Sequence, residues 1–367
     1  MNIQDLIARA LQDGASDIHL VRGLAPRYRL DGSIQEMGGA PLDAAQCADL
    51  ARQLAGNDED FARAEAVGEA DLAITVAGVR CRVNLFRQQG AWSAAIRLLN
   101  EHIPELEELG LPAVVQEFAA YNQGLVLITG ETGSGKSTTL AALLNRINRN
   151  EAKHILTLED PIEYVYTPQR CVINQREIGR DTQSFAAGLR AALREDPDVI
   201  LVGEMRDLET IETALTAAET GHLVFGTVHT NSAADSIDRI VDVFPAERQQ
   251  QIRLQLSMSL QAVLSQQLLP KQGGGRVLAC EVMKTDGAIR NLIREGKTPQ
   301  IANSIQTSGN VGNILMDKAL ANLLAGGQIS QKVYESALRN PNQTNIGSQS
   351  AAGRPGLTPN RPGFNRI

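Results

Sequence analysis

An apolar run that ends in a glycine-rich loop is the feature that most limits how this chain can fold. Residues 125–128 read Leu-Val-Leu-Ile, residues 130–137 read Gly-Glu-Thr-Gly-Ser-Gly-Lys-Ser, and a helical pattern follows over residues 138–147. This order fits G-x-x-x-x-G-K-[ST] between a buried strand and a helix. Glycines there let backbone N–H groups turn inward around phosphate oxygens, at the positive end of the helix dipole. Residues 130–137, the phosphate loop, therefore predict a phosphate site.

Three further apolar runs, residues 155–158, 199–202 and 223–228, follow this loop and are separated by helical patterns. Strands that are apolar on both faces and alternate with helices predict a parallel sheet covered by helices. Each run ends in polar residues, at the edge where such open sheets bind their ligands. We therefore expect an α/β domain over residues 113–340, with additional helices towards its C-terminal end.

The first 98 residues follow a different pattern. A helical pattern over residues 3–11, a strand at 17–20 and two hairpins, 28–34 around Asp31-Gly32 and 71–86 around Ala77-Gly78, predict a smaller α+β domain over residues 1–98. Residues 99–112 are interpreted as a linker, because they contain two prolines and an acidic cluster. Residues 341–367 hold four Pro, four Gly and four Asn but no acid, so they are interpreted as a disordered tail.

Composition and charge argue against three classes of protein: nucleic-acid-binding, membrane-spanning and secreted proteins. The net charge of −7 argues against a broad nucleic-acid surface. No apolar stretch approaches the ~18–20 residues of a membrane span, and the N-terminus lacks the features of a signal peptide. The four cysteines have no metal-site or disulfide spacing, so we expect buried, reduced thiols. These features predict a cytoplasmic protein that does not bind nucleic acid.

Lys136 and Ser137 close the phosphate loop and have separate expected roles. Lys136 should reach the β and γ phosphates of a nucleotide, and the Ser137 hydroxyl should bind Mg²⁺. A second metal ligand is needed, and Glu204 follows the apolar run 199–202 directly after Gly203. We expect Glu204 to bind Mg²⁺ directly or through water; the alternative is a solvated strand-end carboxylate.

Other polar residues stand at the remaining strand ends. Glu163 is the candidate for polarising the attacking water, with Glu159 or Asp160 orienting the site, since three neighbouring acids repel one another unless a cation or water network uses them. His229 is a candidate for a hydrogen bond to the γ-phosphate. For each acid the alternative is a helix cap or turn carboxylate, and for the histidine it is a structural role.

The motifs together resemble those of the type II/IV secretion-superfamily ATPases. The phosphate loop with Thr138, residues 159–163, residues 193–207 and residues 226–233 resemble, in order, the Walker A motif, Asp box, Walker B motif and His box of that family. The resemblance implies a RecA-like P-loop ATPase core, a PAS-like N-terminal domain and a homohexamer that binds ATP and Mg²⁺. It implies nucleotide contacts from Gly130, Glu131, Thr132, Gly133, Ser134, Gly135, Lys136, Ser137 and Thr138.

Two arginines of the N-terminal domain gain a role only through this resemblance. Arg82 and Arg97 match family arginines that approach phosphate across a domain or subunit boundary, where such a charge contributes ~10³–10⁵ in rate in the best cases. By spacing alone they are solvated strand residues. The resemblance thus adds them to Lys136, Glu163, Glu204 and His229 as catalytic candidates.

Within the superfamily, the chain is most similar to the ATPases that retract type IV pili. Residues 288–295, Ala-Ile-Arg-Asn-Leu-Ile-Arg-Glu, match a retraction motif, and the four-cysteine zinc insert of pilus-assembly ATPases is absent. The resemblance implies a motor for pilin disassembly and twitching motility, docked at the cytoplasmic face of the inner membrane on a platform protein, with an accessory retraction ATPase as a further partner. The alternatives are a pilus-assembly or type II secretion ATPase, or an accessory subunit that binds nucleotide without hydrolysing it.

Overall fold

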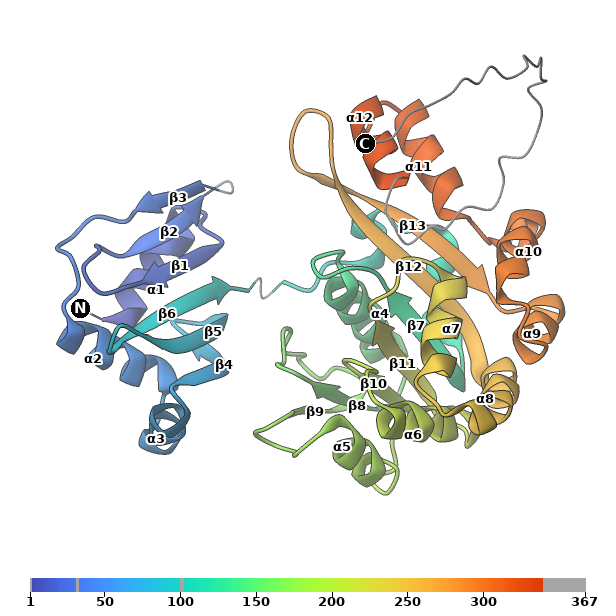
Figure 1. The fold of residues 1–367 in the computed structure, drawn as a ribbon, viewed down its shortest axis with the longest axis horizontal. Helices are drawn as coiled ribbons and strands as arrows, with labels where there is room; N and C mark the ends of the chain where they lie inside the picture. Colours follow the sequence, from blue (N-terminus) through green and yellow to red (C-terminus); the bar gives the residue numbers. More distant parts are fainter. Residues whose placement is uncertain (1, 31–32, 100–101, 339–367) are drawn as a thin grey trace, which may run out of the picture.

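Two separate sheets organise the chain in the computed structural model, which describes residues 2–30, 33–99 and 102–338 (Figure 1). The smaller sheet packs on one buried apolar core, and the larger sheet has one on each face. The predicted Asp31-Gly32 turn and the predicted tail at 341–367 lie outside the described residues.

The N-terminal sheet is antiparallel, with the strand order β3-β2-β1-β6-β5-β4. Its strands are β1 (Asp17–Leu20), β2 (Arg27–Leu30), β3 (Ser33–Glu36), β4 (Glu69–Val76), β5 (Val79–Gln88) and β6 (Ala91–Leu98). The helices that share its core are α1 (Ile3–Gln12), α2 (Ala44–Ala55) and α3 (Asp58–Val67). Buried and half-buried residues alternate along β5, as expected for a strand with one face on a core. The α+β prediction is confirmed.

The turn between β4 and β5 explains the tight hairpin that the sequence predicted. Ala77 and Gly78 both have positive φ, 52° and 80°, as the central residues of a type I′ turn require. Such turns match the right-handed twist of the strands, so the register of β5 is fixed from its first residue.

The larger sheet has the order β13-β12-β7-β11-β10-β8-β9, with β13 antiparallel to β12 and every other neighbouring pair parallel. The four apolar runs form β7 (Gly124–Thr129), β8 (His154–Glu159), β10 (Val199–Val202) and β11 (Leu223–Val228). The other strands are β9 (Val172–Glu177), β12 (Leu260–Pro270) and β13 (Arg276–Lys284). The parallel sheet predicted from these runs is therefore confirmed.

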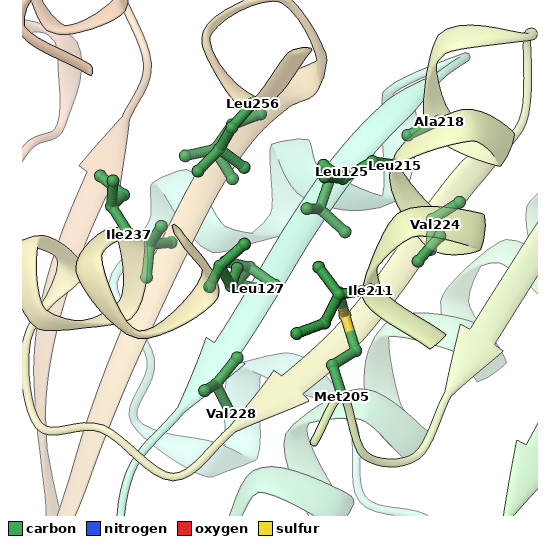
Figure 2. Packing of buried hydrophobic residues seen from close by; sticks show 14 of the residues in the cluster. Leu125, Leu127, Met205, Ile211, Leu215, Ala218, Val224, Val228, Ile237 and Leu256 are labelled. Atoms are coloured by element: carbon green, nitrogen blue, oxygen red, sulfur yellow. The ribbon is translucent and has the colours of Figure 1, made fainter. Parts of the chain in front are cut away.

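Helices cover this sheet and bury an apolar core on each face. On one face, side chains of β7 and β11 meet those of α6 (Leu208–Glu219), α7 (Ala233–Asp242) and α8 (Ala246–Ser259), as Figure 2 shows around Leu125 and Leu127. The core of the other face includes α4 (Lys136–Asn150). The helix α5 (Phe185–Ala192) packs with α6 in the first of these cores.

The sequence did not predict β6 of the smaller sheet or β9 and β12 of the larger one, and the last two were missed for different reasons. β9 is the outer strand of the sheet, and polar side chains occupy most of it. β12 is interrupted by Ser265 and Gln266, which are buried but hydrogen-bonded: Ser265 Oγ lies 2.8 Å from Thr129 Oγ1, and Gln266 Nε2 donates to Thr139 Oγ1 at 2.8 Å. These partners are distant in sequence, so the apolar pattern alone does not mark the strand.

Part of the expected linker packs against the larger domain. The segment contains a 3₁₀ turn, η1 (Leu106–Leu109), and a second one, η2 (Ala113–Ala120), follows it. Leu106 is buried in the core beside α4, and Arg146 of α4 donates to Glu107 at 3.0 Å. The second half of the segment is thus held in place by apolar burial and ion pairs.

The chain continues into further helices beyond β13. They are α9 (Gly287–Arg294), the 3₁₀ turn η3 (Thr298–Gln300), α10 (Ile301–Thr307), the 3₁₀ turn η4 (Gly309–Val311), α11 (Met316–Ala325) and α12 (Gln331–Leu338). Within α9, Ile289 and Ile293 are buried, while Arg290 Nη1 donates to the carbonyls of Ser257 and Met258 at the end of α8. Within the described ranges, no helix is both long enough and apolar enough to cross a bilayer.

A buried carboxylate of β13 joins two of these helices. Glu281 is 5% exposed and accepts hydrogen bonds from the backbone N–H groups of Ala233, at 2.7 Å, and Met316, at 3.3 Å. These residues begin α7 and α11, so one side chain satisfies an N-terminal donor of each helix.

Candidate nucleotide site

The phosphate loop connects the end of β7 to the start of α4 and depends on its glycines. Gly130, Gly133 and Gly135 have φ values of 141°, 83° and 96°. A Cβ on Gly130 would lie 2.4 Å from the carbonyl oxygen of Gln266, whereas one on Gly133 or Gly135 would meet no atom within 4 Å. Packing therefore requires glycine at position 130, and backbone conformation favours it at the other two positions.

The N-terminus of α4 is suited to binding an anion. No side chain caps it, as is also the case for α8, α10 and α11, whereas Asp207, Ser232 and Asp286 cap α6, α7 and α9 in the same domain. Ser134 Oγ, inside the loop, is buried without a hydrogen-bond partner among the described residues. Helix-end N–H groups without a cap, and a buried hydroxyl without a partner, fit a bound phosphate that would satisfy them.

Lys136 is the first residue of α4, and its side chain reaches back to the start of the loop. Its Nζ donates to the carbonyls of Gly130, at 2.7 Å, and Glu131, at 2.9 Å. Burial lowers the pKa of Lys136, and the nearby carboxylates of Glu204, Glu163 and Glu131 act in the opposite direction. The structure thus brings the lysine and two of the predicted acids, Glu163 and Glu204, into one electrostatic cluster.

Glu204 and His229 come together from neighbouring strands. Glu204 follows β10 and His229 follows β11, and His229 Nε2 lies 3.0 Å from Glu204 Oε1. Arg206 forms a second ion pair with the same carboxylate. Burial, with the charges of Lys136 and Arg206, lowers the pKa of His229 although Glu204 opposes the shift. The surroundings of His229 therefore favour its neutral form.

Glu163 belongs to a loop, residues 160–166, that leaves β8 and is named here the acidic loop. Tyr164 OH in this loop lies 3.0 Å from Thr138 Oγ1 in the first turn of α4, which ties the acidic loop to the phosphate loop. Glu159, just before it, accepts from Thr157 Oγ1 at 2.6 Å and Gln175 Nε2 at 3.3 Å. Burial raises the pKa of Glu159 to about 7, so this carboxyl is partly protonated at neutral pH.

Among the described residues, no hydrogen bond or ion pair joins Arg82 or Arg97 to the phosphate loop. They face each other across β5 and β6, where Arg97 donates to Asp17 at 3.0 Å. Arg82 forms no ion pair with any residue in the part of the chain that the structure describes. The residue that reaches the larger domain is Arg80, two positions earlier on β5, which forms an ion pair with Glu177. Sequence reasoning missed it, although its alternation with Arg82 puts both on one face of the strand.

Ser137 and Glu204, the two candidate metal ligands, suit a metal ion that is also coordinated by the phosphates of the nucleotide. Ser137, in the first turn of α4, is exposed, and Glu204 lies in the same cluster as Lys136. The described residues contain no group of three or more His, Cys, Asp or Glu side chains that would hold a metal ion unaided. This donor set fits Mg²⁺, which usually keeps one or two protein ligands, several waters and substrate phosphates.

Comparisons with known proteins agree with this site. A family model described as type II/IV secretion system protein matches residues 1–343. The type IV pilus retraction ATPase PilT of Pseudomonas aeruginosa is 51% identical over 333 residues, which cover 90% of this chain and 96% of that protein. A twitching motility protein of Neisseria gonorrhoeae is 45% identical over 86% of this chain and 84% of its own length.

A solved structure extends the similarity to three dimensions. The crystal structure of the pilus retraction motor PilT with bound ADP superimposes with a TM-score of 0.86 at 48% identity, over 93% of this chain and 98% of that one. The predicted fold class is therefore confirmed.

Proposed function

Since the chain belongs to the type II/IV secretion system protein family, we propose that it is an ATP-hydrolysing motor that retracts type IV pili. The observation that carries the proposal is the meeting of Lys136, Glu204 and His229 beside a phosphate loop whose helix has no side-chain cap. The relatives described as a pilus retraction ATPase and a twitching motility protein, and the ADP-bound motor of the same fold, support it.

The residues of the phosphate loop and Thr138 would hold the nucleotide phosphates. Lys136 would exchange its contacts with two backbone carbonyls for contacts with phosphate oxygens, and Ser137 and Glu204 would hold Mg²⁺ directly or through water. When bound, Mg-ATP supplies the phosphoanhydride bond whose hydrolysis releases phosphate. Glu163 would orient the attacking water. His229 would exchange its contact with Glu204 for a hydrogen bond from Nε2 to the terminal phosphate.

The working unit that we propose is a homohexamer in the cytoplasm, docked on an inner-membrane platform protein. Arg82 and Arg97 would then meet phosphate only when the N-terminal domain closes or a neighbouring subunit presents them. ATP and ADP would drive movement to the extent that they contact the open and closed states differently, since a ligand shifts an equilibrium only by that difference.

A retraction motor is favoured over the two alternatives by particular residues. The four cysteines are buried and free, and the described residues contain no cluster of metal-binding side chains. A pilus-assembly ATPase would be expected to carry four cysteines that bind zinc. The proximity of Glu163 and Glu204 to Lys136 favours turnover over nucleotide binding without hydrolysis. An accessory retraction ATPase remains part of the proposal as a partner.

Phosphate release from the purified protein tests the site. Lys136→Ala should lower the rate of ATP hydrolysis ~10²-fold or more, and Lys318→Ala, which removes an exposed lysine on α11, should leave it unchanged. Hydrolysis by Lys136→Ala at the wild-type rate would show that the proposed nucleotide site is wrong.

Deletion of the gene distinguishes a retraction ATPase from an assembly ATPase. Cells with excess pili and no twitching motility indicate retraction, and cells without pili indicate assembly.

A further inference from the structure

The acidic loop is held in place mainly by side chains from outside it. It contains no helix or strand, yet it carries Glu163. Gln175 of β9 donates from Nε2 to the carbonyl of Tyr164, at 2.8 Å, and accepts through Oε1 from the N–H of Tyr166, at 3.0 Å. β9 therefore fixes the second half of the loop.

The first half of the loop is fixed at Ile162, the residue immediately before Glu163. Its N–H donates to Glu177 Oε2 of β9, at 3.2 Å, and its carbonyl accepts from Arg80 Nε, at 3.3 Å. Arg80 Nη2 also donates to Glu177 Oε2, at 3.4 Å. The two side chains thus hold the residue from its N–H and from its carbonyl, and they also hold each other.

Arg80 is the member of this group that comes from the other domain. It lies on β5 of the N-terminal sheet, and it is 15% exposed while Glu177 is 11% exposed. Separation of the domains would leave Glu177 without its Arg80 partner, and removing one partner from a largely buried ion pair is costly. Burial raises the pKa of Glu177, while Arg80 and Arg180 act against that rise. Docking of the N-terminal domain therefore favours the charged form of Glu177, the carboxylate that holds Ile162 of the acidic loop.

The interface around this ion pair leaves room for movement. A cavity of about 500 Å³ lies beside Arg80, between α3 and β4 on one side and residues 177–180 on the other. Apolar side chains do not fill this space, so the hydrogen bonds of Arg80 with Ile162 and Glu177 contribute much of the contact between the domains here.

We propose that Arg80 and Glu177 are positioning residues that hold Glu163 in its working place only while the N-terminal domain is docked on β9. The proposal rests on the proposed function, because it requires Glu163 to orient the attacking water. Docking would then set the rate of hydrolysis without setting the affinity for nucleotide. The N-terminal domain would thus allow ATP hydrolysis by holding the backbone of Ile162 in the acidic loop.

The main test separates turnover from binding in Arg80→Gln. We expect the kcat for ATP to fall about tenfold or more, since misplacing a reacting group by ~1 Å costs up to ~10²-fold, while the Kd for a fluorescent ADP stays within about twofold of the wild type. Arg63→Gln is the matched control, since it removes a positive charge that lines the same cavity and is paired with Asp60. Hydrogen exchange at residues 160–166 should accelerate in Arg80→Gln only.

Charge reversal tests whether the two residues act as a pair. Arg80→Glu and Glu177→Arg should each lower kcat, and the double variant should recover part of it, because it restores the ion pair that joins the N-terminal domain to β9. Arg80→Lys, which keeps the charge with a single donor group, should have an intermediate kcat and serves if Arg80→Gln does not fold. The absence of any recovery would contradict the pairing of the two residues.

The outcomes separate this proposal from the proposed function. Wild-type kcat in Arg80→Gln, or a parallel loss of ADP binding, overturns the positioning role when Glu163→Gln is inactive. Full activity of Glu163→Gln overturns the role of Glu163 and this proposal with it. Absence of ATP hydrolysis in the wild-type protein instead refutes the motor itself.

Discussion

Glu281→Gln should change how the stability of the larger domain depends on pH. Burial raises the pKa of Glu281 to about 7 in the folded protein, although the N–H groups of Ala233 and Met316 oppose this, and its ordinary value is 4.5. The folded state therefore holds this proton over a pH range in which the unfolded state has lost it. The stabilisation is complete below pH 4.5 and is lost as the pH rises to about 7.

The size of the effect follows from the two pKa values. Raising the pKa from 4.5 to about 7 corresponds to about 3 kcal/mol, at about 1.36 kcal/mol per pH unit. Glutamine does not titrate, so the variant should gain about 3 kcal/mol relative to the wild type between pH 4.5 and 8. At low pH the variant should be less stable by about 1–3 kcal/mol, because one amide oxygen cannot serve both N–H donors equally well.

Urea unfolding at a series of pH values measures this difference. Far-UV circular dichroism of the full chain at pH 5, 6, 7 and 8, without nucleotide and at one protein concentration, gives the free energy of unfolding for each variant. Glu335→Gln, on the exposed face of α12, should follow the wild type at every pH. Curves for Glu281→Gln and the wild type that stay parallel would mean that Glu281 is ionised in the folded protein, which would refute the reasoning.

Two further substitutions test the local structure. Gly130→Ala places a Cβ 2.4 Å from the Gln266 carbonyl, so it should cost about 1–3 kcal/mol and abolish ADP binding, whereas Gly133→Ala meets no atom within 4 Å and should cost less. Equal melting temperatures for the two variants would contradict this. Asp207→Ala removes the N-cap of α6 and the partner of the buried Thr210 hydroxyl, so urea unfolding should show a loss of about 1–3 kcal/mol with ADP affinity unchanged.

The fold of the larger domain was predictable where burial is complete on both faces. The residues of β7, β10 and β11 are all buried, so their apolar runs are continuous and mark the strands directly. β12 was not predictable in this way, because Ser265 Oγ and Gln266 Nε2 find their hydrogen-bond partners on side chains more than 100 positions away. Only the folded chain supplies those partners.

The site was predictable to the extent that strand ends meet at one edge. This rule groups Lys136, Glu204 and His229, which the structure indeed brings together. The rule does not predict whether Arg80 or Arg82, which share one face of β5, contacts the larger domain. That contact depends on how the two domains dock. The expected approach of Arg82 to phosphate stays a prediction.

The hydrogen bonds of Arg290 affect how genetic screens of the retraction motif should be interpreted. Its guanidinium is engaged by the two carbonyls that end α8, so a substitution there releases the end of that helix as well as changing α9. Loss of motility in such a mutant would therefore report a displaced helix and would not by itself identify a surface that touches another protein. Exposed positions of the same motif, such as Glu295, are better choices for mapping that contact.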